Sequence, residues 1–142
     1  MRSGETVLIG WVESMSQPAL AFFDGEFIPL ADATVNVQTK AVQYGLGCFE
    51  GIRAYWNESD GVLRIFRVRE HFERLAHSCR ILNLENGYSV DDMVAAAEEL
   101  CRRNDYACDV YIRPIVFNNS CELSPVMGNG DNVFAIYGFP LR

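Results

Sequence analysis

Two residues of the apolar segment 110–117 have the chemistry to bind a carboxylate. Arg113 lies between Ile112 and Pro114, and Tyr111 precedes it by two positions. Alternate side chains of a strand project from the same face, so the guanidinium and the phenol are expected side by side. The planar guanidinium matches the two oxygens of a carboxylate. Judged from the residues alone, an internal salt bridge to one of the 19 acidic residues is the more common arrangement.

A further arginine, Arg74, falls in the first or second turn of a predicted helix over residues 70–84. The free N–H groups and the dipole at a helix start favour anions, so Arg74 could bind a phosphate there. The alternative is a solvated arginine paired with Glu70, four residues earlier, which is a common and weak interaction. Arg74 alone does not decide between the two.

The segment from Tyr44 to Arg53 concentrates unusual residue types in ten positions. It combines two aromatic residues, three glycines, and a glutamate and an arginine that can form ion pairs: Tyr44, Phe49, Gly45, Gly47, Gly51, Glu50 and Arg53. Glycines permit a tight backbone path close to a ligand. The same composition would also suit the start of a strand with a glycine bulge and core aromatic residues.

The elements that must position these residues follow from the hydrophobic pattern. Asp24-Gly25 between apolar β-formers predicts a hairpin over residues 21–28, because both turn positions need a positive φ. A polar turn at residues 57–61 predicts a second hairpin, and alternation predicts further strands. The remaining predicted strand segments are residues 35–37, 52–56, 62–66, 110–117 and 133–137.

Two helices are predicted between the hairpins and the last strands. Residues 70–84 carry an apolar stripe at three- and four-residue steps: Phe72, Leu75, Cys79 and Leu82. Ser89 with Asp92 resembles a capping box and predicts the start of a second helix. Strand pairs around two consecutive helices indicate an α+β fold, with both helices packed on one face of a mainly antiparallel sheet.

Composition restricts the classes of partner and location. The chain has 142 residues, 49% hydrophobic and 22% charged, and a net charge of −7, which disfavours nucleic acid and anionic membranes. No segment approaches the roughly 20 apolar residues of a membrane span, and the N-terminus is a poor signal peptide. Five cysteines without a Cys-x-x-Cys pair, and two histidines, favour reduced thiols, a cytoplasmic protein and no metal site. Residues 1–20 are expected to be a loose extension, and residues 21–142 one domain.

Three motifs in register resemble a known family. Phe49-Glu50-Gly51-Ile52-Arg53, preceded by Tyr44-Gly45, is similar to the signature of branched-chain amino-acid aminotransferases, which are fold-type IV (class IV) pyridoxal-phosphate enzymes. The similarity continues through residues 69–75 and through Tyr111-Ile112-Arg113-Pro114, and covers residues 21–141 in order. The last motif favours the branched-chain group over the D-amino-acid transaminases and aminodeoxychorismate lyases that share the fold. The resemblance implies the small N-terminal lobe of such an enzyme.

The resemblance also implies roles for individual residues. Arg74 matches the arginine that binds the phosphate of pyridoxal 5'-phosphate. Phe49, Tyr111 and Arg113 match the substrate pocket, where aromatic walls hold an aliphatic side chain and the arginine–tyrosine pair helps accept the second carboxylate of glutamate. The implied substrates are amino acids and 2-oxo acids, with transfer between leucine, isoleucine or valine and 2-oxoglutarate.

Contacts between subunits are implied in the same way. Tyr44 matches a residue that reaches the substrate pocket of the neighbouring subunit, so a homodimer is expected. The loop over residues 118–132 corresponds to one that also approaches the partner's site. It is glycine-rich in many relatives, whereas here it begins Asn-Asn-Ser-Cys-Glu-Leu-Ser-Pro, which leaves the substrate preference open.

The lysine that forms a Schiff base with the cofactor is not expected in this chain. The one lysine, Lys40, falls where relatives carry lysine or histidine without that role. In the family the catalytic lysine lies in the second, C-terminal lobe, and the sequence ends where the interlobe linker starts. We therefore expect no catalytic residue here, an inactive chain without that lobe, and self-association through exposed apolar surface. A non-catalytic binding module is the alternative, but the retained Arg74 and Arg113 argue against it.

Overall fold

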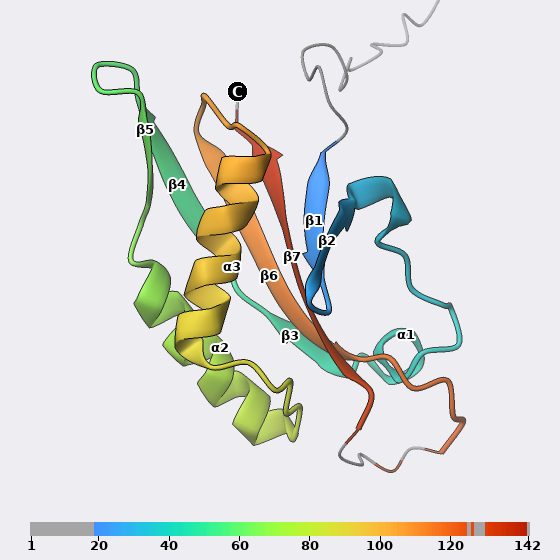
Figure 1. The fold of residues 1–142 in the computed structure, drawn as a ribbon. Coiled ribbons are helices and arrows are strands. Elements are labelled where there is room, and N and C mark those ends of the chain that lie inside the picture. Colours follow the sequence, from blue (N-terminus) through green and yellow to red (C-terminus); the bar gives the residue numbers. More distant parts are fainter. Residues whose placement is uncertain (1–18, 125, 127–129, 142) are drawn as a thin grey trace, which may run out of the picture.

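Seven strands of the described part of the chain form one antiparallel sheet (Figure 1). The structure is a computed structural model and describes residues 19–124, 126 and 130–141. The sheet order is β2-β1-β7-β6-β4-β5, and β3 pairs with β6 beside β4. The strands are β1 (Leu20–Phe23), β2 (Glu26–Pro29), β3 (Gly47–Phe49), β4 (Ile52–Asn57), β5 (Val62–Ile65), β6 (Val110–Asn118) and β7 (Asn132–Pro140).

Both predicted hairpins are confirmed. Asp24 (φ 48°) and Gly25 (φ 99°) form the turn between β1 and β2. Two-residue hairpin turns with a positive φ at both positions match the twist of the strands that they join, which explains why Asp-Gly predicts this turn well. Strands β4 and β5 pair as expected around the polar turn that ends at Gly61.

The long helices α2 (Val68–Leu82) and α3 (Val90–Arg103) lie on the same face of the sheet (Figure 1). The predicted capping box is confirmed: the Asp92 backbone N–H donates to the Ser89 hydroxyl, and the Ser89 N–H donates to the Asp92 carboxylate. Asn83, in the left-handed conformation, ends α2. The expected α+β architecture is therefore observed.

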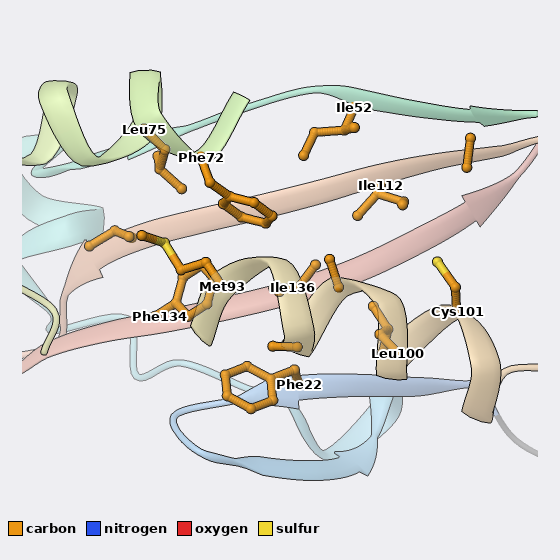
Figure 2. Close-up of a cluster of buried hydrophobic side chains, with 14 of the residues drawn as sticks. Phe22, Ile52, Phe72, Leu75, Met93, Leu100, Cys101, Ile112, Phe134 and Ile136 are labelled. Carbon is orange, nitrogen blue, oxygen red and sulfur yellow. The ribbon is translucent and has the colours of Figure 1, made fainter. Parts of the chain in front are cut away.

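The main core lies between these helices and the sheet (Figure 2). Each element contributes the side chains of one face only, in agreement with the helical and strand periodicities. Its fully buried side chains include Phe72 and Leu75 from α2, Met93 and Leu100 from α3, and Ile52, Ile112, Phe134 and Ile136 from the sheet. These residues hold the helices in register with β6 and β7, the strands that carry the candidate site.

The structure corrects two local predictions. Residues 35–37 are not a strand, and Val35 and Val37 are 47% and 74% exposed, because no neighbouring strand pairs with this alternating segment. A short helix, α1 (Lys40–Tyr44), was not expected; five residues are too few to show a helical period. A 3₁₀ turn, η1 (Leu30–Asp32), follows β2.

The expected division of the chain between residues 20 and 21 stays a prediction. The first strand of the described residues, β1, begins at Leu20. The rest of the expected extension, residues 1–18, lies outside the described residues. Within the described ranges, no helix has the length and hydropathy needed to cross a bilayer.

Candidate functional site

The face of the sheet opposite α2 and α3 carries the residues expected to bind substrate. Alternation along β6 directs Ile112 into the core and Tyr111 and Arg113 to the other face. The strand register places Arg53 opposite Tyr111 and Tyr137 opposite Arg113. We call this region the open face; it consists of Phe49, Arg53, Tyr111, Arg113, Tyr137 and Phe139.

Arg113 is the centre of the open face. Its Nη2 donates to the Tyr111 hydroxyl at 3.0 Å, and its Cζ lies 4.2 Å from the centre of the Phe49 ring. Its Nε is buried without a hydrogen-bond partner, and no ion pair of Arg113 is found among the described residues. The internal salt bridge that the residues alone favoured is therefore not observed. The guanidinium keeps donors for an external anion.

This guanidinium lies over the rings of Phe49 and Tyr111. Phe49 is 59% exposed, which is unusual for a phenylalanine at a sheet surface. Phe139 is also exposed and lies with its ring centre 5.4 Å from that of Tyr137 and 6.4 Å from that of Tyr111. The open face therefore offers apolar walls next to a cation, an arrangement that suits a ligand with both an aliphatic part and a carboxylate.

Gly51 allows Tyr111 to occupy its position. A Cβ atom on Gly51 would overlap the Tyr111 hydroxyl, and the carbon that carries this hydroxyl would be only 2.8 Å away. Any other residue at position 51 would push the phenol away from Arg113. The sequence motif does not predict this contact of Gly51, because the approach of Tyr111 depends on strand pairing.

The structure places Arg74 on α2, held by Glu50. The Arg74 Nε lies 2.5 Å from Glu50 Oε1, and its Nη2 lies 2.6 Å from Oε2. The alternative pairing with Glu70 is wrong, because Glu70 pairs with Arg67. Arg74 is the seventh residue of α2, so the free N–H groups of the first turn do not reach it, and this helix-start argument for phosphate binding is not supported.

Glu50 is a further candidate for the site, for which the sequence predicted no more than the ability to form an ion pair. Its side chain is only 7% exposed, and its Oε2 also lies 3.0 Å from His71 Nδ1. Burial raises the pKa of Glu50, but the hydrogen bonds and charges of Arg74 and His71 outweigh this effect and hold the pKa below its usual value. Glu50 is therefore a buried carboxylate. The sequence feature that could have marked Glu50 as a candidate is its place as a glutamate within a glycine-rich, apolar segment.

Tyr44 lies on α1 and contacts the loop after β6. Its hydroxyl donates to the Leu123 carbonyl at 2.6 Å, and 48% of the residue is exposed. Lys40, one turn earlier, is 5% exposed and donates from Nζ to the Val126 carbonyl at 2.9 Å. Within the described residues, no hydrogen bond joins either side chain to Tyr111 or Arg113. Lys40 and Tyr44 thus hold the loop.

The fold brings three of the expected residues together and leaves two apart. Phe49, Tyr111 and Arg113 form one contact group on the open face, whereas Arg74 lies on α2 and Tyr44 on α1. Residues 49–51, where β3 ends and β4 is about to begin, contact three of the other residues considered for the site. Phe49 lies against Arg113, Glu50 binds Arg74, and Gly51 makes room for Tyr111.

Known proteins with the same sequence pattern are aminotransferases. The family model described as amino-transferase class IV matches residues 47–140. The probable branched-chain-amino-acid aminotransferase of Aquifex aeolicus (strain VF5) is 39% identical over 117 residues, 82% of this chain and 38% of the relative. The branched-chain-amino-acid aminotransferase of Pseudomonas aeruginosa is 39% identical over 99 residues, 70% of this chain and 31% of the relative.

Solved structures give the same result for the fold. The branched-chain aminotransferase from Thermoproteus uzoniensis with norvaline has a TM-score of 0.84 and 33% identity, covering 89% of this chain and 42% of that chain. The Thermobaculum terrenum enzyme in its PLP form has a TM-score of 0.78 and 32% identity, covering 87% and 40%. The described fold is thus that of the N-terminal domain of these enzymes. The chain spans about a third to two fifths of the length of the relatives it matches.

Proposed function

The chain belongs to the class IV amino-transferases, and we propose that it forms the lobe of a branched-chain amino-acid transaminase that recognises substrate and cofactor phosphate. The proposed reaction transfers an amino group between leucine, isoleucine or valine and 2-oxoglutarate. The names of the relatives support this assignment over the shared part of the chain.

The observation that carries the proposal is the uncommitted guanidinium of Arg113. It is fixed by the Tyr111 hydroxyl and the Phe49 ring, and no carboxylate of the described residues neutralises it. A transaminase with these substrates must accept both an aliphatic side chain and the distal carboxylate of glutamate in one pocket. Arg113 and Tyr111 would bind the carboxylate, and Phe49 would contact the aliphatic chain.

Arg74 is suited to hold the phosphate of pyridoxal 5'-phosphate. Glu50 engages Nε and Nη2, while Nη1 has no partner among the described residues and the side chain is 64% exposed. A guanidinium has five N–H donors in a fixed fork, so the edge beyond Glu50 can still bind a phosphate. When bound, the cofactor supplies the aldehyde that accepts the amino group and the ring that withdraws electrons from the α-carbon.

The amine that moves the α-proton is proposed to come from a second lobe. Lys40 is a poor candidate, because it is buried and its Nζ is engaged by the Val126 carbonyl, with the Glu122 carboxylate 3.9 Å away. A lysine that bonds to the cofactor needs a free amine within its reach. This chain by itself is therefore proposed to bind and orient, without performing amino transfer.

A homodimer is proposed for the working enzyme. Tyr44 is half exposed on α1 and bonds to the Leu123 carbonyl, and Lys40 bonds to the Val126 carbonyl, so this side of α1 is proposed to face the neighbouring subunit. The exposed rings of the open face would be covered by the second lobe. Isolated, the chain should self-associate, which sedimentation equilibrium would measure.

The proposed substrate site can be tested by ligand titration of the chain, followed by NMR. The probes are 2-oxoglutarate and 4-methyl-2-oxopentanoate, the oxo acid of leucine, which lacks the distal carboxylate. Arg113→Met should weaken 2-oxoglutarate binding about tenfold and change binding of the aliphatic acid little, since one charge-assisted contact is lost. Arg64→Met, at an exposed arginine paired with Asp60, is the matched control and should bind as wild type. Equal 2-oxoglutarate affinity of wild type and Arg113→Met would reject the site.

Activity measurements distinguish the alternatives. Assembled with a lysine-bearing lobe, the enzyme should use L-leucine far better than D-alanine as the amino donor. Preference for D-alanine would instead indicate a D-amino-acid transaminase. Amino transfer by this chain alone, abolished in Lys40→Arg, would overturn the assignment of the catalytic lysine to a second lobe.

A further inference from the structure

Glu50 is a carboxylate in the interior of the domain. The residue is 6% exposed, and its backbone N–H donates to the Pro114 carbonyl at 3.0 Å between β3 and β4. Removing a carboxylate from water is unfavourable unless partners compensate, and an apolar residue of similar size often stabilises such a position equally well. Stability of the sheet therefore does not by itself account for a glutamate here.

Every contact of the Glu50 carboxylate leads to one turn of α2. Both of its oxygens bind Arg74, through Nε and Nη2, and Oε2 also lies 3.0 Å from His71 Nδ1. The Arg74 Nη2 lies 3.2 Å from the same histidine nitrogen. A two-point pairing fixes the plane of the guanidinium as well as its position.

This pairing orders a side chain whose one other polar contact among the described residues is with His71. Arg74 is 64% exposed, and an exposed arginine samples many rotamers, which it must give up when it binds a ligand. Glu50 restricts those rotamers in the folded protein, before any ligand arrives. Only the edge that carries Nη1 remains available, and it is held in a single direction.

We propose that Glu50 is a positioning residue that presents Arg74 to the phosphate of the cofactor. The inference rests on the proposed phosphate role of Arg74 and extends it by naming the residue that orders it. Because residues 49–51 also contact Arg113 and Tyr111, the same short segment sets the phosphate-binding and the carboxylate-binding arginines.

A structural role for Glu50, tying α2 to the sheet, makes a different prediction. Loss of a purely structural tie would lower the stability of the domain and weaken the binding of every ligand. Loss of a positioning contact would selectively weaken ligands that carry a phosphate. The ratio of affinities for two ligands that differ only in the phosphate separates the two roles.

The test is titration of the 142-residue chain with pyridoxine 5'-phosphate and with pyridoxine, followed by the arginine Nε signals in NMR. Neither ligand has an aldehyde, so no covalent reaction complicates the binding. Glu50→Gln should weaken binding of the phosphate ester about five- to tenfold and leave pyridoxine binding within about twofold. Glu73→Gln, next to Arg74 on the same helix, makes the same charge change at an exposed residue and should bind as wild type.

Arg74→Met separates the failure of this inference from the failure of the proposed function. If Arg74→Met weakens binding of the phosphate ester and Glu50→Gln does not, Arg74 keeps its role and the positioning role of Glu50 is refuted. If Arg74→Met binds the phosphate ester as wild type does, or if wild type shows no response at Arg74, the phosphate role is refuted and this inference with it. Glu50→Gln should add no further loss in the Arg74→Met background.

Glu50→Asp covers the case in which Glu50→Gln does not fold. Aspartate keeps the charge but is one methylene shorter, so it cannot reach both nitrogens of Arg74 from the same backbone. It should fold and show the same selective loss for the phosphate ester. Wild-type affinity in Glu50→Asp would overturn the positioning role.

Discussion

The covered face and the open face of the sheet are made from alternate residues of the same strands, yet they differ in burial and in how far their polar groups are paired. On β6, Ile112 is fully buried beneath the helices, while Arg113 on the opposite face has a buried Nε without a partner. The side chains of the covered face pack against α2 and α3 within the domain. The open face leaves a cation and several aromatic rings unsatisfied, which is what a ligand or a second lobe would complete.

The break between β3 and β4 connects the two faces. The Phe49 side chain lies on the open face, where the Gly51 backbone lies against Tyr111, and the Glu50 side chain, between them, points toward α2. A strand alternates its side chains between faces, so three consecutive residues can serve two sites. The residues of this family motif are thus divided between both sides of the sheet.

The largest expected loss of stability comes from a substitution on the covered face. Phe72→Ala should lower the free energy of unfolding by about 3–5 kcal/mol, because it removes a fully buried ring and leaves a cavity. Phe49→Ala, the matched change on the open face, should cost less than about 1 kcal/mol, since Phe49 is already exposed. Urea denaturation of both variants measures the difference. Similar losses would show that the open face is also a stability core.

A smaller loss is expected at the break between the strands. Gly51→Ala should destabilise the protein by about 1–3 kcal/mol, because the new Cβ overlaps Tyr111. The double variant Gly51→Ala/Tyr111→Ala should be no less stable than Tyr111→Ala alone, because the clash is then absent. Thermal unfolding of the three variants tests this coupling. Independent, additive losses would contradict the contact.

The acid dependence of stability should report the charge of Glu50. The folded state lowers its pKa, so the unfolded state binds the proton more readily, and stability rises with pH through this range. The contribution is complete above the ordinary carboxyl pKa of 4.5 and is lost as pH falls toward the lower folded value. The free energy of unfolding, measured from pH 7 down to about pH 3.5, should therefore fall less steeply in Glu50→Gln than in wild type. Glu73→Gln keeps Glu50 and should follow the wild type; equal slopes in all three proteins would contradict the charged state.

The smallest expected effect is at Arg113. Arg113→Met should change the free energy of unfolding by less than about 1 kcal/mol, because the guanidinium forms no ion pair with the described residues and its Nε is already unsatisfied. Urea denaturation would measure this change. A loss above about 2 kcal/mol would mean that Arg113 supports the fold as well as the site.

The elements with strong local signals were predicted well. The Asp24-Gly25 turn, the Ser89 capping box and the stripe on α2 depend on residues close in sequence, and each is confirmed. The strand at residues 35–37 was predicted from alternation alone and is wrong, since a strand needs a neighbour that local pattern cannot supply. Helix α1 was missed for its length.

Some contacts of the candidate site residues were predicted from the sequence and others were not. The spacing of Tyr111 and Arg113 correctly predicted that they would touch, because strand alternation is a local rule. The partner of Arg74 could not be predicted, since Glu50 lies 24 positions away and meets it only when α2 packs on the sheet. The phosphate and substrate roles of these residues stay predictions.

By itself, the sequence determined most of the elements, the α+β class and the family motifs of this protein, because periodicity, turn chemistry and residue spacing act over a few residues. Only the tertiary structure decided which charges are paired. It joined Glu50 to Arg74, left Arg113 without an ion pair among the described residues, placed Gly51 against Tyr111 and buried Lys40 near the Val126 carbonyl. These outcomes depend on strand register and helix packing, which bring distant residues together and set the cost of each buried charge.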